Sequence, residues 1–353
     1  MSLVAHRATK GMDPLDLAAE MTLHRLGLLL LATAALALCP GVGSAAARVT
    51  MAPGDVVGQA APTVVPHSTL PGAGKFEGPV SRLAVDGIEI GYRQFGHGPD
   101  LVMVQGDTAP MSLWMPYLLR PLAQGFRVTI FDNRGVGFTT DDLARPITVP
   151  LMARDTGELI EALGLAKPTL VGWSMGGEIG LTLAEQEPAL LGALVTTGGD
   201  AGSSHTVPPP PGLVRELANP KASTKVFLEL LFPATPAGGA ATARFVHGFE
   251  SIPQEKVSPR TLKRQEAAEE AFLKYDGTWD GLPSINVPTL LTNGGVDPGV
   301  PPVNARRMHA RIPGSVLSIY ASAAHGMLFQ DAERFAAQIA KFSARARAGA
   351  AAG

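Results

Sequence analysis

A serine between two glycines is the feature of this sequence that could do chemistry. Ser174 stands in Gly172-Trp173-Ser174-Met175-Gly176, after an apolar run that predicts a buried strand and before a segment typical of a helix. A serine on such a strand-to-helix turn adopts a strained backbone conformation, and small flanking residues keep the turn clear of the strand and the helix. The first free amides of the helix then point towards the reacting atom. The pattern therefore predicts a nucleophile.

Two later residues supply the base and the acid that a serine hydroxyl needs. A serine is a weak nucleophile at neutral pH until a histidine takes its proton, and a carboxylate holds that histidine in the correct tautomer. His325 and Asp297 each follow an apolar run that predicts a strand. Because the carboxyl ends of parallel strands meet at one edge of a sheet, we predict a catalytic triad of Ser174, Asp297 and His325. Asp200, which follows an earlier strand, is the alternative acid.

From about residue 83 to residue 342 the chain resembles α/β-hydrolase-fold proteins of the serine esterase and non-haem peroxidase-like group. The resemblance is carried by Gly172 to Gly177, Phe131 to Gly137, the loop around Asp297 and Ala324-His325-Gly326. It implies an α/β fold with a mostly parallel sheet, helices on both faces and a helical cap insertion. It specifies the substrate much less, because this fold carries many chemistries.

The resemblance assigns the oxyanion donors to backbone amides. By position these are the N–H groups of Met175 and Asp107, although this chain has glutamine and glycine before Asp107 where the family typically has histidine and glycine. An ionised Asp107 side chain would oppose the charge on an oxyanion, so we expect it to point away or to be neutral. Capping of the helix that begins near Ala109 is its expected use. Trp173, beside the nucleophile, is a candidate substrate contact.

The elements that must position these residues alternate along the chain. A hairpin is predicted over 82–95, and from residue 101 strands alternate with helices. The helices are predicted over 111–123, 150–163, 176–186, 302–310 and 331–346. This alternation favours a mostly parallel sheet with helices on both faces. Arg134, in a loop after a strand, is expected to pair with carboxylates near the sheet and to take no part in catalysis.

The alternation breaks over residues 201–284, which we predict to be a helical cap inserted into an α/β core made of 80–200 and 285–347. Consecutive prolines open the insertion, and its helical segments, 222–232 and 261–275, carry apolar side chains. An insertion between strands that carry the site is expected to fold over the pocket and to select the substrate. Its apolar residues suggest a small-molecule ester with an apolar acyl or alcohol group.

The N-terminal residues are predicted to lie outside the fold. Residues 1–47 contain Arg25, an apolar run and then small residues, which is typical of a cleaved signal peptide, and residues 48–79 have the composition of an extended linker. We therefore expect an exported protein, secreted, periplasmic or in the cell envelope, with no stable membrane span after cleavage. An uncleaved anchor, a start at Met21 and lipidation of Cys39 are alternatives.

Composition agrees with a globular enzyme. Of the 353 residues, 46% are hydrophobic, which suffices for a substantial core, and a net charge of −2 gives no reason to expect nucleic-acid binding. The sequence contains no zinc-ligand cluster and no phosphate-binding glycine pattern, so we predict no metal and no organic cofactor.

We therefore predict an exported serine hydrolase that cleaves carboxylic esters through an acyl-enzyme on Ser174. Perhydrolysis, carbon–carbon bond hydrolysis and peptide cleavage on the same fold are alternatives, as is a secreted binding protein without turnover. A peptidase could use Glu266, Glu269 and Glu270 to bind an amino terminus, but their helical setting favours a solvated surface.

Overall fold

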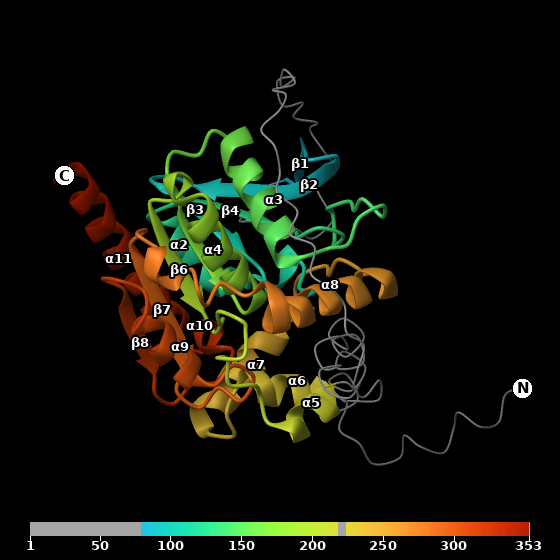
Figure 1. Ribbon diagram of the computed structural model, residues 1–353. Coiled ribbons are helices and arrows are strands. Elements are labelled where there is room, and N and C mark those ends of the chain that lie inside the picture. The colour runs from blue at the N-terminus through green and yellow to red at the C-terminus, as the bar shows by residue number, and fades with distance from the viewer. Residues whose placement is uncertain (1–78, 218–223, 353) are drawn as a thin grey trace, which may run out of the picture.

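The structure is a computed structural model that describes residues 79–217 and 224–352. The predicted signal peptide, with Met21 and Cys39, and nearly all of the predicted linker lie outside the described residues. The strands are β1 Ser81–Val85, β2 Ile88–Gly96, β3 Asp100–Val104, β4 Arg127–Phe131, β5 Thr169–Trp173, β6 Ala193–Thr197, β7 Thr289–Gly294 and β8 Val316–Tyr320. They form one sheet of eight strands in the order β1-β2-β4-β3-β5-β6-β7-β8 (Figure 1).

The first two strands form the predicted hairpin. The turn has φ angles of 41° at Asp86 and 77° at Gly87, both left-handed, as a tight two-residue turn between twisted strands requires. β2 then pairs antiparallel with β4, and every other neighbouring pair from β4 to β8 is parallel. The mostly parallel sheet expected from the alternating pattern is confirmed.

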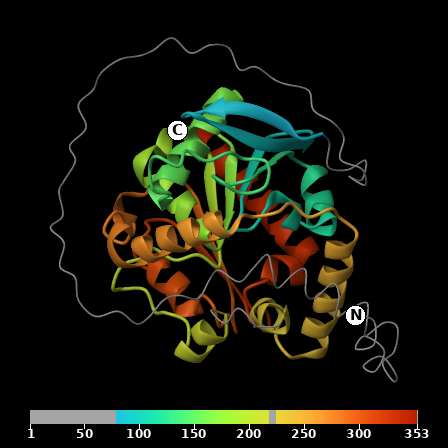
Figure 2. The ribbon, with the colours of Figure 1, turned by 90° about the vertical axis from the view of Figure 1, so that its right-hand side faces the viewer.

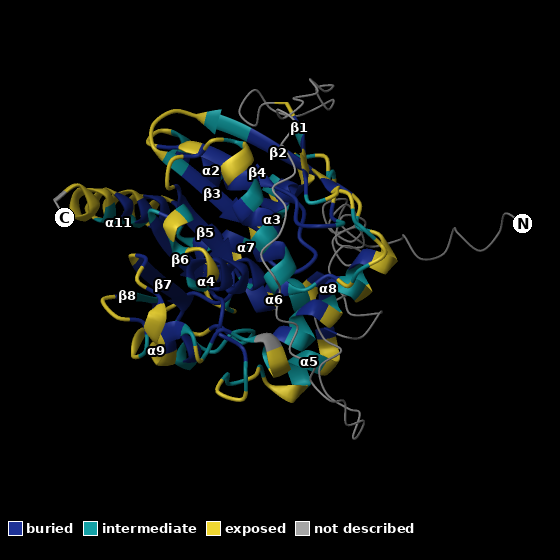
Figure 3. Ribbon diagram, turned by 45° about the horizontal axis from the view of Figure 1, so that its top comes forward, coloured by how far each residue is buried: buried dark blue, intermediate teal, exposed yellow. Residues whose placement is uncertain are grey.

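Helices pack on both faces of the sheet, and they span α2 Pro116–Ala123, α3 Val149–Ala162, α4 Met175–Gln186, α9 Pro302–His309 and α11 Ala332–Ala352. Successive residues of a strand point to opposite faces. Leu101 and Met103 of β3 accordingly join one apolar core with α2 and α11, whereas Val102 and Val104 join another with α3, α4 and α9. Figure 3 shows the sheet buried between helices whose outer surfaces are exposed.

The helix expected over 111–123 is divided in two. A single 3-10 turn, η1, spans Met111–Leu113, and α2 begins only at Pro116. Met115 is extended, with φ −62° and ψ 137°, because a proline ring disfavours the helical conformation in the residue before it. At the other end of the chain, α11 continues past the predicted end at residue 346 to Ala352.

The insertion between β6 and β7 is helical, as predicted. It contains α5 Pro211–Leu217, α6 Thr224–Leu231, α7 Pro236–Glu250, α8 Pro259–Ala271 and the π-helical turn η3 Phe272–Asp276. In two perpendicular views, α5 to α7 lie on the side of the molecule opposite the β1–β2 hairpin (Figures 1 and 2). Short turns of helix occur at η2 Pro188–Leu190, η4 Leu282–Ser284 and α10 Met327–Gln330. None of the helices described is both long and apolar enough to cross a membrane.

Candidate active site

Ser174 lies on a strained turn between β5 and α4. Its φ of 55° and ψ of −126° are rare for a residue other than glycine. The flanking glycines are required by space, since a Cβ on Gly172 would lie 2.0 Å from the carbonyl oxygen of Gly176, and a Cβ on Gly176 2.1 Å from that of Val104. The amide of Ser174 donates to the carbonyl of Thr197 at 2.9 Å, which ties the turn to β6. The serine itself stays partly exposed.

His325 and Asp297 lie together at the carboxyl ends of β8 and β7. Nδ1 of His325 is 2.9 Å from Oδ2 of Asp297. Oδ1 of Asp297 accepts the amides of Gly299 at 2.8 Å and Val300 at 2.9 Å, so the loop holds this carboxylate in one orientation. Burial lowers the pKa of His325, but the charge and hydrogen bond of Asp297, together with the charge of Glu269, raise it above its ordinary value. The imidazole is therefore poised to hold a proton.

The alternative acid, Asp200, has different partners. Its Oδ1 accepts the amide of Gly202 at 2.8 Å and the hydroxyl of Thr206 at 3.1 Å. The loop that carries it still borders the site, because a Cβ on Gly198 would lie 3.1 Å from Nδ1 of His325. Asp200 thus stabilises the turn after β6, and the imidazole faces Asp297.

Trp173 joins the strand of Ser174 to the loop of His325. Its indole N–H donates to the backbone carbonyl of His325 at 3.1 Å, and the two rings lie 5.5 Å apart. Phe329 of α10 packs edge-on against the indole at 5.2 Å. Because Trp173 is the last residue of β5, these contacts bring the histidine loop to the end of the strand that precedes Ser174. Substrate contact by this side chain, which is 4% exposed, stays a prediction.

The loop after β3 also borders Ser174. A Cβ on Gly106 would lie 3.0 Å from Cβ and 3.7 Å from Oγ of Ser174, so Asp107, the next residue, enters the same neighbourhood. Met175 is the first residue of α4, where amides have no acceptor within the helix. The structure therefore brings both predicted oxyanion donors next to the serine, and their donation to an oxyanion stays a prediction.

The Asp107 side chain does not cap a helix, contrary to the expectation from sequence. Asp132 does so instead, because its Oδ1 accepts the amide of Met111, the first residue of η1, at 2.6 Å. Within the described residues, both carboxyl oxygens of Asp107 lack a hydrogen-bond partner, and the residue is 6% exposed. Burial, together with Glu269 and Glu266, raises the pKa of Asp107 well above its ordinary value. A protonated Asp107 does not oppose an oxyanion.

Glu269 is a candidate residue that sequence reasoning placed on a solvated surface. Glu270 fits that expectation, since it forms an ion pair with a lysine one turn later. Glu269 is partly buried, and burial, with the charges of Asp200 and Glu266, raises its pKa to about 7, although His325 lowers it. Adjacent glutamates on one helix carry no sequence signal that separates them. Only the packing of α8 against the loop after β3 distinguishes Glu269 from Glu270.

Arg134 pairs with carboxylates near the sheet, as predicted. Its Nε and Nη2 donate to the two carboxylate oxygens of Asp155 at 2.8 and 2.6 Å. Nη2 also lies 3.7 Å from Oδ2 of Asp86. The side chain is buried and connects the loop after β4 to α3, so it stabilises the fold around the site.

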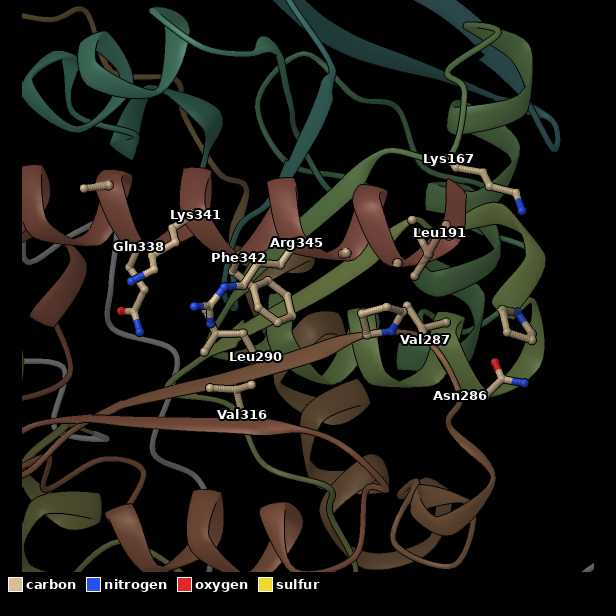
Figure 4. A pocket seen from close by; sticks show the side chains of 17 residues that line it. Lys167, Leu191, Asn286, Val287, Leu290, Val316, Gln338, Lys341, Phe342 and Arg345 are labelled. Carbon is tan, nitrogen blue, oxygen red and sulfur yellow. The ribbon is translucent and has the colours of Figure 1, made fainter. Parts of the chain in front are cut away.

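A cavity of about 920 Å³ lies at the amino ends of the strands, away from these residues. Figure 4 shows Lys341, Phe342 and Arg345 of α11 beside Leu290 and Val316, at the start of β7 and β8. None of the residues that line this cavity belongs to the predicted site. The chemistry is therefore expected at the opposite end of the sheet, where Ser174 follows β5, Asp297 follows β7 and His325 follows β8.

The chain is similar to known hydrolases over most of its described length. The α/β hydrolase fold family matches residues 99–332. A protein named as a carbamate hydrolase, RutD of Caulobacter sp. (strain K31), is 29% identical over 275 residues, which cover 73% of this chain and 96% of that protein. An α/β hydrolase fold protein from Chitinophaga pinensis has 26% identity and a TM-score of 0.67, over 75% of this chain and 97% of its own. The esterase EaEST from Exiguobacterium antarcticum has 26% identity and a TM-score of 0.60, and the match covers 74% of this chain and 97% of that esterase.

Proposed function

Because the chain belongs to the α/β-hydrolase family and resembles proteins named as hydrolases, we propose that it is an exported serine hydrolase that cleaves carboxylic esters. One observation carries the proposal. The strained Ser174 follows β5, and its neighbour Trp173 holds the loop of His325, whose Nδ1 is 2.9 Å from Asp297. This arrangement supports a serine nucleophile served by a histidine base and an orienting carboxylate.

In the proposed mechanism, His325 takes the proton of Ser174 while the serine oxygen attacks the ester carbonyl. The amides of Asp107 and Met175 donate to the tetrahedral oxyanion, and α4 directs the positive end of its dipole towards it. The alcohol leaves with the proton from His325. Water, deprotonated by the same imidazole, then cleaves the acyl-enzyme and frees the carboxylic acid. Asp297 holds the Nδ1–H tautomer and stabilises the imidazolium without accepting its proton.

The insertion supports a substrate with an apolar group. The carbonyls of Leu230 and Leu231, at the end of α6, accept the amides of His325 at 3.2 Å and Gly326 at 2.9 Å. The side chain of Leu230 reaches the loop of Asp297, because its Cδ1 would lie 2.6 Å from a Cβ on Gly299. An apolar helix end is thus fixed over the base and the acid, where an acyl or alcohol group would enter.

Labelling by a fluorophosphonate tests the nucleophile directly. We expect the wild-type protein to be labelled and to hydrolyse p-nitrophenyl esters, with Ser174→Ala losing both activities. Ser284→Ala removes an exposed hydroxyl that donates to the carbonyl of Gly281, and it should retain both. A folded wild-type protein that is not labelled contradicts the proposal. Esters of increasing acyl length then measure how much apolar surface the site accepts.

The proposal that the protein is exported is based on Arg25, the apolar run after it and the small residues that end at Ala47. We expect the mature protein outside the cytoplasm with a new amino terminus near residue 47. Sequencing the amino terminus of protein recovered from each cell fraction tests this. Full-length protein confined to the cytoplasm would rule export out, and intact protein in the membrane fraction would favour an uncleaved anchor.

A further inference from the structure

Within the described residues, two buried carboxyl groups near Ser174 have oxygens without a hydrogen-bond partner. Asp107 follows Gly106, the residue packed against Ser174, and both its oxygens lack a hydrogen-bond partner within the described part of the chain. Glu178, in the first turn of α4, is 2% exposed, and its Oε2 is likewise without a partner there. Burying a carboxyl group without a partner is costly, so these groups require either a proton or a positive charge from outside the chain.

Helix α8 brings further carboxyl groups to the same place. Gln265, fully buried, accepts the amide of Thr108 with its Oε1 at 2.7 Å and donates its Nε2 to the carbonyl of Arg134 at 2.9 Å. These bonds fix α8 against the loop that carries Asp107. Glu266 is the next residue along α8 and Glu269 lies one turn further on, so both belong to the part of the helix that meets this loop.

The far end of α8 rests on the loop after β6. A Cβ on Gly202 would lie 2.5 Å from the carbonyl oxygen of Phe272, one turn beyond Glu269. Glu269 therefore lies on the stretch of α8 between its contact with the loop after β3, which carries Asp107, and its contact with the loop after β6, which carries Asp200. The charge of Glu269 also acts on His325, which places this carboxyl group within electrostatic range of the proposed base.

The charged groups around Glu269 are almost all acidic. Those on the elements packed against it are Asp107 after β3, Glu178 on α4, Asp200 after β6, His325 after β8 and Glu266 on α8, with Lys263 acting on Glu266. Within residues 79–217 and 224–352, no three His, Cys, Asp or Glu side chains converge as a metal site would require. An organic cation is therefore the occupant that this arrangement fits.

We propose that Asp107, Glu266 and Glu269 form a subsite for a positively charged group of the substrate, an alkylammonium joined by a few bonds to the scissile ester. This deepens the proposed function and rests on it. The subsite lies between the body and the insertion, with Asp107 beside Ser174 and the glutamates on the insertion side. A bound ammonium supplies the charge that the chain itself does not provide, and its binding releases protons from these carboxyl groups.

Matched esters test the proposal. The first pair is a choline ester and its neutral carbon isostere, in which a tert-butyl group replaces the trimethylammonium group of the alcohol. The second pair makes the same exchange on the acyl side of a p-nitrophenyl ester. We expect kcat/KM to favour the cation by about tenfold in one pair, which also identifies the side of the ester that carries the charge. The preference should rise with pH through about 7, where Glu269 loses its proton.

Two single-residue variants separate the subsite from general effects. Glu269→Gln should reduce the preference for the cationic ester several-fold, whereas Glu270→Gln, the adjacent residue with its own lysine partner, should leave it unchanged. Equal kcat/KM within both pairs, with the neutral esters hydrolysed, overturns the subsite and leaves the proposed function intact.

A binding measurement covers the case in which no ester is hydrolysed. Titration calorimetry of Ser174→Ala with each ester of both pairs, in two buffers of different ionisation enthalpy, should show tighter binding of the cation in one pair and release of protons. Adding Glu269→Gln should remove that advantage. Loss of turnover and labelling in the wild-type protein contradicts the hydrolase, and equal binding within both pairs contradicts the subsite.

Discussion

Two groups of carboxylates in this molecule differ in their partners. In the first, Asp155 accepts two hydrogen bonds from Arg134, and Asp86 accepts one from Arg145 at 2.8 Å and another from Arg154. Burial raises the pKa of Asp86, but the hydrogen bonds from Arg154 and Arg145 lower it below its ordinary value. This group joins the β1–β2 turn, the loop after β4 and α3, and every member contributes to the fold.

The second group surrounds the candidate nucleophile. Asp107 and Glu178 are buried with oxygens that have no partner among the described residues. The charge of Glu269, on α8 of the insertion, acts on both. Burial and mutual repulsion raise the pKa of Glu178 well above its ordinary value and that of Glu269 to about 7. The carboxylates of the first group thus have arginine partners from the chain, whereas Asp107 and Glu178 of the second have unpartnered oxygens within the described residues and lie near the candidate nucleophile.

The largest effect is expected on turnover, at Asp297, a buried carboxylate that is hydrogen-bonded to His325 in the candidate site. Asp297→Asn should lower kcat about ten-thousand-fold, because the amide supports the wrong tautomer of His325 and cannot stabilise the imidazolium. Pre-steady-state and steady-state ester hydrolysis measure this.

Asp200→Asn is the matched control for that variant, since Asp200 bonds its own turn instead of the imidazole. It should change kcat far less. A larger loss in Asp200→Asn than in Asp297→Asn would reverse the assignment of the acid.

The next largest effect is expected on stability, in the first group of carboxylates, whose partners are arginines. Arg134→Met should lower the free energy of unfolding by about 3–5 kcal/mol, because it leaves Asp155 buried without its partner. The kcat/KM of the folded fraction should be preserved. Urea denaturation measures the loss, and Arg82→Met, which breaks an exposed pair with Glu89, should cost less than about 1 kcal/mol. Equal losses in the two variants would show that the paired group does not stabilise the fold.

Glu178 of the second group and Asp86 of the first should respond to pH in opposite directions. The pKa of Glu178 is raised in the folded state, so its contribution to stability is present at low pH and is lost as pH rises through that raised pKa. The slope is about 1.4 kcal/mol per pH unit for each proton that the folded state retains. The pKa of Asp86 is lowered, so its contribution is lost only as pH falls through that lowered value.

Thermal melts across pH distinguish these contributions. Glu178→Gln should flatten the loss of stability that begins as pH rises above the ordinary glutamate pKa, since the amide has no proton to lose. The exposed Glu89→Gln should leave this loss in place. A Glu178→Gln curve parallel to that of the wild type would argue against unpaired charge near the site.

The smallest effect is on the pH dependence of hydrolysis. The raised pKa of His325 places the acid limb of kcat/KM above the ordinary histidine range, because the base must be neutral. Glu269→Gln removes one of the charges that raise this pKa, so the limb should move to lower pH. Glu270→Gln should not move it. An unshifted limb in Glu269→Gln would place that carboxyl group out of reach of the imidazole.

Residues with a local signal could be found from the sequence. Ser174 stands between glycines that the turn requires, and Asp297 and His325 each follow a strand, so the strand order alone brings them to one edge. Residues whose role depends on packing between distant segments could not be found this way. Asp107 is expected from the sequence to cap a helix, but Asp132 does so, because the first helical turn begins only at Met111 and the loop after β4 reaches its amide.

The sequence by itself determined the sheet, the turn of the nucleophile and the candidate triad, because alternating apolar patterns, glycine spacing and strand order act over short stretches of chain. Only the tertiary structure decided which carboxyl groups receive a partner. Arg134 reaches Asp155 and α8 brings Glu269 towards Asp107 through contacts between segments far apart in sequence. The energy of a buried charge depends on what lies within a few ångströms of it, and that is set by the packed fold.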